Sequence, residues 1–139
     1  MTGAIPRYTG GCLCGAVRYE AEGEPLYAGH CHCADCRKAS GSGFIPFMGF
    51  ASDKVRFSGE TLQVRSPAFR GGEAVRNRCV VCGSLVFGGV VGLDDSHTIY
   101  AGSLDDPGLF QPAMALFARE RPDWVLLPDG MQIFETMPG

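Results

Sequence analysis

The chain has 139 residues, of which 45% are hydrophobic and 19% charged, and its formal net charge is −3. This composition is that of an ordinary globular protein, and the length predicts a single domain over residues 1–139. The negative net charge argues against extensive electrostatic binding to nucleic acid or to an anionic membrane, because such binding depends on clustered positive charge.

Targeting and membrane signals are absent from the pattern of the sequence. No run approaches the roughly 18 consecutive apolar residues of a membrane span. The first residues, MTGAIPRYTGG, lack the charged-then-apolar order of a signal peptide. The expected compartment is therefore the cytoplasm, where thiols stay reduced, and the seven cysteines indicate metal binding or catalysis before disulfides.

Short strand-like segments follow one another along the chain, separated by glycine and proline. In AVRYEA, residues 16–21, the apolar residues Val17, Tyr19 and Ala21 alternate with polar ones, which is the period of a half-buried strand. Similar runs predict further strands within residues 43–51, 54–59, 61–66, 74–79, 84–91 and 97–104.

Helix is expected in only two places. One is a turn or two in ADCRKASG, residues 34–41, and the other is a turn in DDPGLF, residues 105–110, which Pro107 would open after an acidic cap. The sequence thus predicts a mainly β fold of several small sheets with very little helix, whose ends are tied together by metal-binding loops.

All seven cysteines fall into three tight groups: Cys12 and Cys14 in CLCG, Cys31, Cys33 and Cys36 in CHCADC, and Cys79 and Cys82 in CVVCG. Cysteines that served only as small buried hydrophobes would be scattered. A redox C-x-x-C at residues 33–36 would leave five cysteines unexplained. A zinc ribbon that joins residues 33–36 to residues 79–82 would need a spacing of 42 residues, longer than the roughly 15–20 that is typical.

Two zinc sites account for every cysteine. Zinc takes thiolates in tetrahedral sets, with four protein ligands in closed structural sites and three plus an exchangeable position in catalytic ones. We expect Cys12, Cys14, Cys79 and Cys82 to form the closed set, and the remaining three cysteines to form the open one. Gly15 and Gly83 follow the two pairs, where positive φ would turn backbone N–H groups toward the thiolates.

These motifs resemble those of the glutathione-dependent formaldehyde-activating enzyme family, which also contains centromere protein V. The resemblance rests on GGCLCGAVRYE, GHCHCADCRKASGSGF, RCVVCGSLVF, AGSLDDP and Trp124, and it runs from residue 10 to about residue 124. It implies coiled antiparallel β-sheets of the type called a β-tent. It also implies a structural zinc at Cys12, Cys14, Cys79 and Cys82, and a catalytic zinc at Cys31, Cys33 and Cys36.

The activity that the resemblance implies is that of a carbon–sulfur lyase similar to S-(hydroxymethyl)glutathione synthase. A small thiol such as glutathione would bind at the three-cysteine zinc and add to formaldehyde or a related carbonyl. The alternative is a non-enzymatic zinc module that binds a protein or nucleic acid, although the acidic charge argues against nucleic acid. No membrane partner is expected, and the sequence makes no prediction of oligomeric state.

Polar residues close to CHCADC have several possible roles. His30 and His32 flank Cys31, but adjacent residues would have to bend back sharply to reach the same metal, so an exposed or hydrogen-bonding role is expected. Arg37 and Lys38 could meet the carboxylates of a peptide-like substrate, or could simply be solvated. Asp35 is expected to accept backbone N–H bonds within the loop.

Other residues are expected to serve the fold. Trp124 and the run Phe44, Phe47 and Phe50 should be core, since aromatic residues usually contribute by burial. His97 lies in an expected strand and is given a structural role. In QPAMALFARERPDW the family pattern would place a histidine where this chain has Ala115, which predicts a substrate pocket that differs from the family's.

Overall fold

The structure, a computed structural model that describes residues 4–139, is organised around two β-sheets. The smaller sheet pairs β1 (Arg7–Gly11), β2 (Arg18–Glu22) and β5 (Val55–Ser58) antiparallel in that order. Tyr8, Tyr19 and Ala21 are buried and alternate with more exposed residues, because successive side chains of a strand point to opposite faces. The predicted alternation over residues 16–21 is therefore confirmed.

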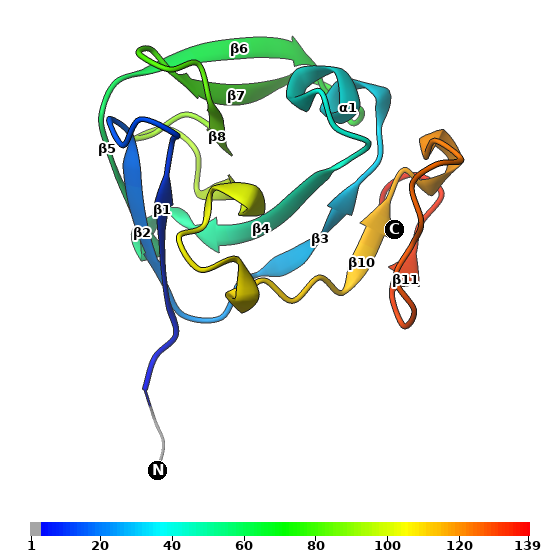
Figure 1. The fold of residues 1–139 in the computed structure, drawn as a ribbon. Coiled ribbons are helices and arrows are strands. Elements are labelled where there is room, and N and C mark those ends of the chain that lie inside the picture. Colours follow the sequence, from blue (N-terminus) through cyan, green and yellow to red (C-terminus); the bar gives the residue numbers. More distant parts are fainter. Residues whose placement is uncertain (1–3) are drawn as a thin grey trace.

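The larger sheet has eight strands in the order β11-β10-β3-β4-β9-β8-β7-β6. Figure 1 shows that it curls so that β6 and β7 lie opposite β3 and β10. Its pairings are antiparallel except around β10, which runs parallel to both β3 and β11. Its strands are β3 (Tyr27–Cys31), β4 (Ile45–Ala51), β6 (Thr61–Pro67), β7 (Glu73–Cys79), β8 (Leu85–Gly88), β9 (Ser96–Tyr100), β10 (Met114–Leu116) and β11 (Gln132–Ile133).

Helical structure is limited to short pieces, as predicted. The helix α1 (Ala34–Ser40) begins after Cys33, whose sulfur accepts the N–H of Cys36, and it ends at Gly41, whose φ is 74°. The 3-10 turn η3 (Pro107–Leu109) has the expected acidic cap, because the Asp106 carboxylate accepts the N–H of Gly108. Three more 3-10 turns are η1 (Ser52–Lys54), η2 (Ala101–Ser103) and η4 (Ala118–Glu120).

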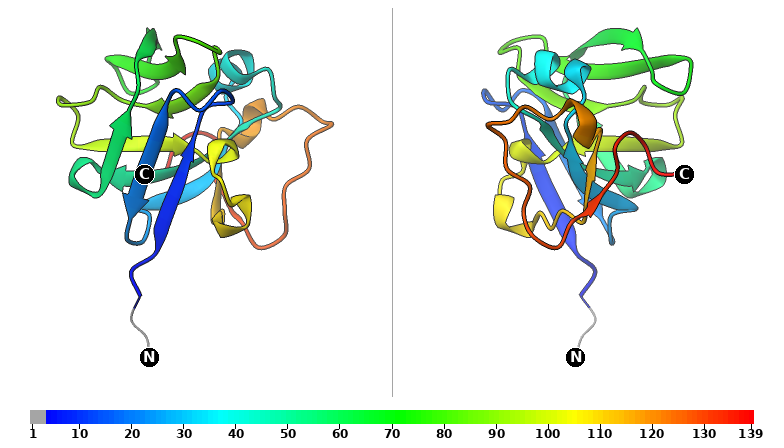
Figure 2. Two further views of the ribbon diagram at one scale, coloured as in Figure 1. Left: turned by 60° about the vertical axis from the view of Figure 1, so that its left-hand side comes forward. Right: turned by 90° about the vertical axis from the view of Figure 1, so that its right-hand side faces the viewer.

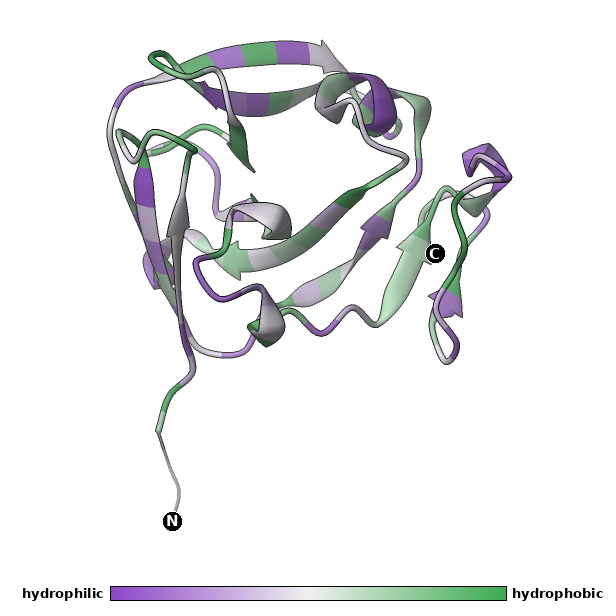
Figure 3. Cartoon of the chain, viewed as in Figure 1, coloured by the Kyte–Doolittle hydropathy of each residue, from purple (hydrophilic) through white to green (hydrophobic). Residues whose placement is uncertain are grey.

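The main core combines side chains from both sheets. Tyr8 on β1 packs against Phe50 on β4 with ring centroids 5.4 Å apart, and Phe57 on β5 stacks on Phe87 on β8 at 3.7 Å. Burial of each such ring contributes about 1.5–3 kcal/mol. By contrast, β6 at the sheet's edge alternates hydrophilic and hydrophobic residues that are nearly all exposed (Figure 3).

The segment after η4 runs over the surface and corrects one prediction. Figure 2 shows residues 121–131 as an extended loop beyond β10. Trp124 in this loop is 72% exposed, so its predicted place in the core is wrong, although one edge of its ring lies over Gly43. Phe47 and Phe50 are buried as predicted, but Phe47 also lines a pocket, contrary to the purely core role expected of it, and Phe44 is half-buried. Within residues 4–139, no helix is long and apolar enough to cross a membrane.

Candidate functional site

Four cysteines from two distant turns meet where the sheets adjoin. Cys12 and Cys14 lie between β1 and β2, and Cys79 and Cys82 lie at the turn from β7 to β8. Their sulfur atoms all lie within 4.8 Å of one another, which is the spacing of a set that could hold one metal ion. The structure therefore brings together the four residues predicted to form the closed site.

Backbone N–H groups surround these sulfurs, as the neighbouring glycines led us to expect. Gly15 and Gly83 have φ of 84° and 79°, a conformation that glycine adopts without strain. In the first turn the N–H of Val17 donates to the Cys12 sulfur at 3.2 Å, and in the second the N–H of Val81 donates to Cys79 at 3.3 Å. N–H donors directed at sulfur in this way are the surroundings expected of thiols that bind a metal.

The other three cysteines meet at the end of β3. Cys31 is the last residue of that strand, and Cys33 and Cys36 lie at the start of α1. Their sulfurs also lie within 4.8 Å of one another. The neighbouring thiols of Cys31 and Cys36 lower the pKa of Cys33, whereas those of Cys33 and Cys36 raise the pKa of Cys31. Three soft sulfur donors placed in this way suit a metal such as zinc.

A buried arginine lies beside this cluster. Arg76 on β7 is only 8% exposed, and its Nη2 points at the Cys36 sulfur at 3.9 Å while its Nη1 donates to the Ser66 hydroxyl at 3.0 Å. Among residues 4–139, no carboxylate lies within ion-pair distance of its guanidinium. A buried cation needs a counter-charge, so the thiolates are its natural partner.

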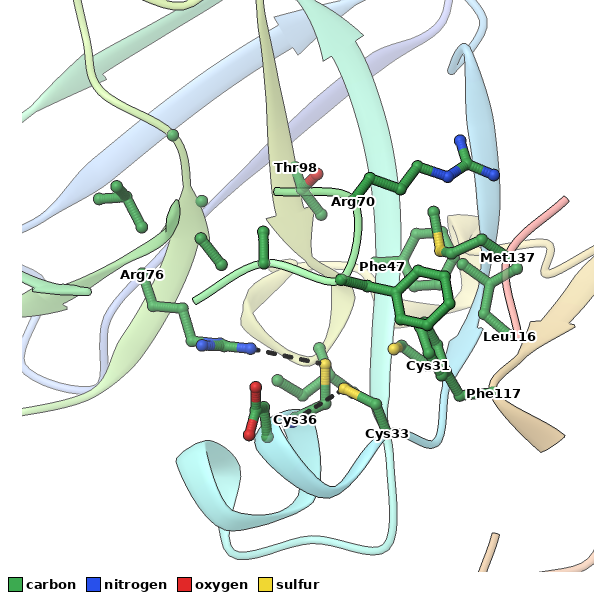
Figure 4. Close-up of a pocket in the computed structure, with 18 of the residues that line it drawn as sticks. Cys31, Cys33, Cys36, Phe47, Arg70, Arg76, Thr98, Leu116, Phe117 and Met137 are labelled. Carbon is green, nitrogen blue, oxygen red and sulfur yellow. Dashed lines mark hydrogen bonds between the residues drawn. The ribbon is translucent and has the colours of Figure 1, made fainter. Parts of the chain in front are cut away.

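The three cysteines open into a pocket of about 860 Å³. Figure 4 shows Phe47, Leu116, Phe117 and Met137 on one side of the cysteines and Arg76 on the other. Phe117 is in the left-handed region with φ of 55°, and its ring meets that of Phe69 edge-on at 5.0 Å. The wall is assembled from β3, β4, the β6–β7 hairpin, β9, β10 and the C-terminal segment.

The two histidines beside Cys31 belong to neither cluster. His30 stacks on Phe44 with centroids 4.2 Å apart, and His32 lies 3.3 Å from the Leu116 carbonyl through Nδ1. Both are buried, so the exposed role offered as one expectation is wrong, and the hydrogen bond of His32 agrees with the other. Burial lowers the pKa of His30 to about 4 and also lowers that of His32.

Arg37 and Lys38, for which carboxylate binding and simple solvation were both considered, do not face the pocket. Neither Arg37 nor Lys38 is among the residues that line it, and Lys38 is exposed. Asp35 does line the pocket, but the loop-holding role predicted for it is filled by Glu120, whose Oε1 accepts the N–H of Ala34 at 2.9 Å. Long-range contacts of this kind leave no local signal in the sequence.

Ala115 also lies away from the pocket. Its neighbours on β10, Met114 and Leu116, line the pocket, whereas Ala115 is fully buried on the opposite face of the strand. The expectation that this position shapes the substrate pocket is therefore wrong. His97 is buried and lies 3.0 Å from the Gly88 carbonyl through Nδ1, which fits the structural role expected of it.

Fold and site together define a mainly β protein with two cysteine clusters, each able to hold a metal, one of them at a pocket. The family model of the glutathione-dependent formaldehyde-activating enzymes matches residues 7–120. The chain belongs to this family.

Other comparisons give less detail. A crystal structure of a Rhodobacter sphaeroides protein, a structural genomics target, is similar at a TM-score of 0.51 and 20% identity over 70% of this chain and 87% of that one. This similarity is evidence of a shared overall fold. A search of curated proteins finds no match.

Proposed function

We propose that this chain binds two zinc ions and uses the three-cysteine site as a carbon–sulfur lyase does, joining a small thiol to formaldehyde or a related carbonyl. The observation that supports it most is the difference between the two clusters. Four sulfurs complete a tetrahedral set at Cys12, Cys14, Cys79 and Cys82, whereas Cys31, Cys33 and Cys36 supply three and face a pocket. Family membership is consistent with this chemistry.

The chain's own residues have distinct parts in this proposal. Zinc at the three cysteines would supply an open coordination position at which a thiol loses its proton. Arg76 balances the negative charge of the thiolates from within the protein, and Phe47, Leu116 and Phe117 exclude water from one side of the site. Holding thiol and carbonyl together in this pocket reduces the entropic cost of the addition.

Zinc content separates the two sites experimentally. Cys33→Ser should lower zinc from two ions per chain toward one and keep the fold, because the four-cysteine set remains intact. Cys79→Ser should destabilise the whole domain, since a structural metal contributes directly to folding. Far-UV circular dichroism and thermal unfolding of both variants report the fold.

Activity is then measured on wild-type protein that carries two zinc ions. NMR would follow formation of the adduct between formaldehyde and several thiols, with Cys33→Ser as the matched control for the uncatalysed reaction. A faster rate or a bound thiol that depends on the three cysteines supports the proposal. Two bound zinc ions with neither thiol binding nor acceleration would refute it, and would favour a non-enzymatic module that binds a macromolecular partner.

A further inference from the structure

The walls of the pocket indicate what kind of thiol could occupy it. From the three cysteines outward, the wall includes Phe47, Leu116 and Phe117, followed by Phe69 at the tip of the β6–β7 hairpin and Met137 in the C-terminal segment. Phe69 is 60% exposed although its ring meets that of Phe117. An exposed aromatic side chain at a pocket mouth gains stability when an apolar ligand covers it.

The charges around the pocket are arranged poorly for a substrate with two carboxylates. Four acidic residues line it, and only two cations do so among residues 4–139. Arg76 is directed at Cys36, so Arg70 alone is left to meet a carboxylate farther out, and its guanidinium points away from the cysteines (Figure 4). Arg70 already donates to the Pro138 carbonyl.

The acidic residues mostly have partners of their own. Glu73 pairs with Arg65 at 3.2 Å, Glu120 accepts the N–H of Ala34, and Asp94 accepts the N–H of Val90. They therefore add negative potential to the pocket and are not free hydrogen-bonding groups awaiting a ligand. A carboxylate that enters this environment loses hydration and, among the described lining residues, finds only Arg70 as a compensating cation, so its desolvation is costly.

We infer that the thiol taken by this pocket is an apolar one, such as an alkyl or aryl thiol, in preference to glutathione, which carries two carboxylates and one ammonium group. The inference rests on the proposed function, because it assumes that a thiol reaches the three-cysteine site. The aromatic and aliphatic wall binds the hydrocarbon part of such a thiol, while its sulfur is directed at Cys31, Cys33 and Cys36. No carboxylate then has to be desolvated.

Cobalt(II) in place of zinc makes thiol entry visible, because each sulfur that reaches the metal adds charge-transfer absorption. Protein loaded with cobalt at both sites is titrated with benzyl mercaptan and with glutathione, compared at equal thiolate concentration. We expect benzyl mercaptan to bind at least about tenfold more tightly, as burial of a phenyl ring without carboxylate desolvation predicts.

Phe69→Ser tests the wall itself, with Leu13→Ser as the control. Leu13 is also an exposed apolar residue, at 90%, but it lies beside the four-cysteine cluster and not in the pocket. Phe69→Ser should lower the affinity for benzyl mercaptan by about fivefold and leave the affinity for glutathione unchanged. Leu13→Ser should change neither.

The outcomes distinguish this inference from the function on which it rests. If neither thiol alters the cobalt spectrum, the proposed function fails together with the inference. If glutathione binds as tightly as benzyl mercaptan or more tightly, or if Phe69→Ser weakens both equally, the inference is overturned while thiol binding at the three-cysteine site stands.

Discussion

Replacing Arg76 by methionine should weaken metal binding at the three-cysteine cluster and leave the four-cysteine cluster unchanged. Loading a zinc dication onto three thiolates gives a site of net charge −1, and an added thiolate makes it −2. Arg76 is the buried cation closest to this charge, with its Nη2 3.9 Å from the Cys36 sulfur. Methionine removes the charge while filling much of the same space.

The magnitude follows from that distance. Two unit charges 3.9 Å apart interact by about 4 kcal/mol at an effective dielectric constant of about 20. The negative charge is shared among three sulfurs, two of which are not in contact with Arg76, so we expect a loss of about 1.5–3 kcal/mol. That corresponds to a roughly 10- to 100-fold weaker affinity for zinc at this site, and a comparable loss for a thiolate that binds there.

Competition with a zinc chelator measures both sites in one titration, and Arg76→Lys and Arg65→Met serve as controls. Lysine keeps the positive charge, so Arg76→Lys should retain part of the zinc affinity. Arg65 lies on β6 in an ion pair with Glu73, and Arg65→Met should leave zinc affinity at both clusters unchanged. An unchanged zinc affinity in Arg76→Met, or equal losses at both clusters, would refute the electrostatic role.

Two further predictions concern stability. Hydrogen bonds from Arg18 and Thr9 hold the pKa of Asp105 at about 2, below its ordinary 3.8. The contribution of these hydrogen bonds to the stability of the fold is therefore present above about pH 4 and is lost as pH falls toward 2. The difference in urea midpoint between wild type and Asp105→Asn should be constant near neutral pH and shrink below about pH 4. Gly29→Ala would place a Cβ 2.4 Å from the Met114 carbonyl oxygen, on the strand that pairs with β3. The variant should therefore have a lower melting temperature. Amide hydrogen exchange should also be faster in β3 and β10, because their pairing is loosened. A difference for Asp105→Asn that survives at acidic pH, or a Gly29→Ala variant with wild-type protection, would contradict them.

The local elements could largely be predicted from the sequence because their signals are local. Alternation placed a strand at residues 16–21, and Pro107 with an acidic cap placed a turn that the structure contains. The clustered cysteines likewise indicated which thiols the structure brings together into two groups, each able to hold a metal ion, since metal geometry restricts which thiols can share one ion. A chemical requirement shared by several residues thus carries information across long sequence separations.

The pocket could not be predicted in the same way. Arg76, Phe69 and Phe117 come to line the same pocket as the three cysteines only through the curl of the larger sheet, and nothing near them in sequence indicates that they share a cavity. Trp124 illustrates the opposite error, because composition favours burial while its loop runs over the surface. Side chains that meet through tertiary packing alone leave no periodic pattern to read.

The four-cysteine cluster also imposes an order of events on a newly made chain. Cys12 and Cys14 are synthesised with the first strand of the smaller sheet, but their partners follow only at residues 79 and 82, some 70 positions later. At roughly 5–20 residues per second the early thiols wait several seconds without the other half of their set. For that interval Cys12 and Cys14 lack the two thiols beside which they lie in the folded structure.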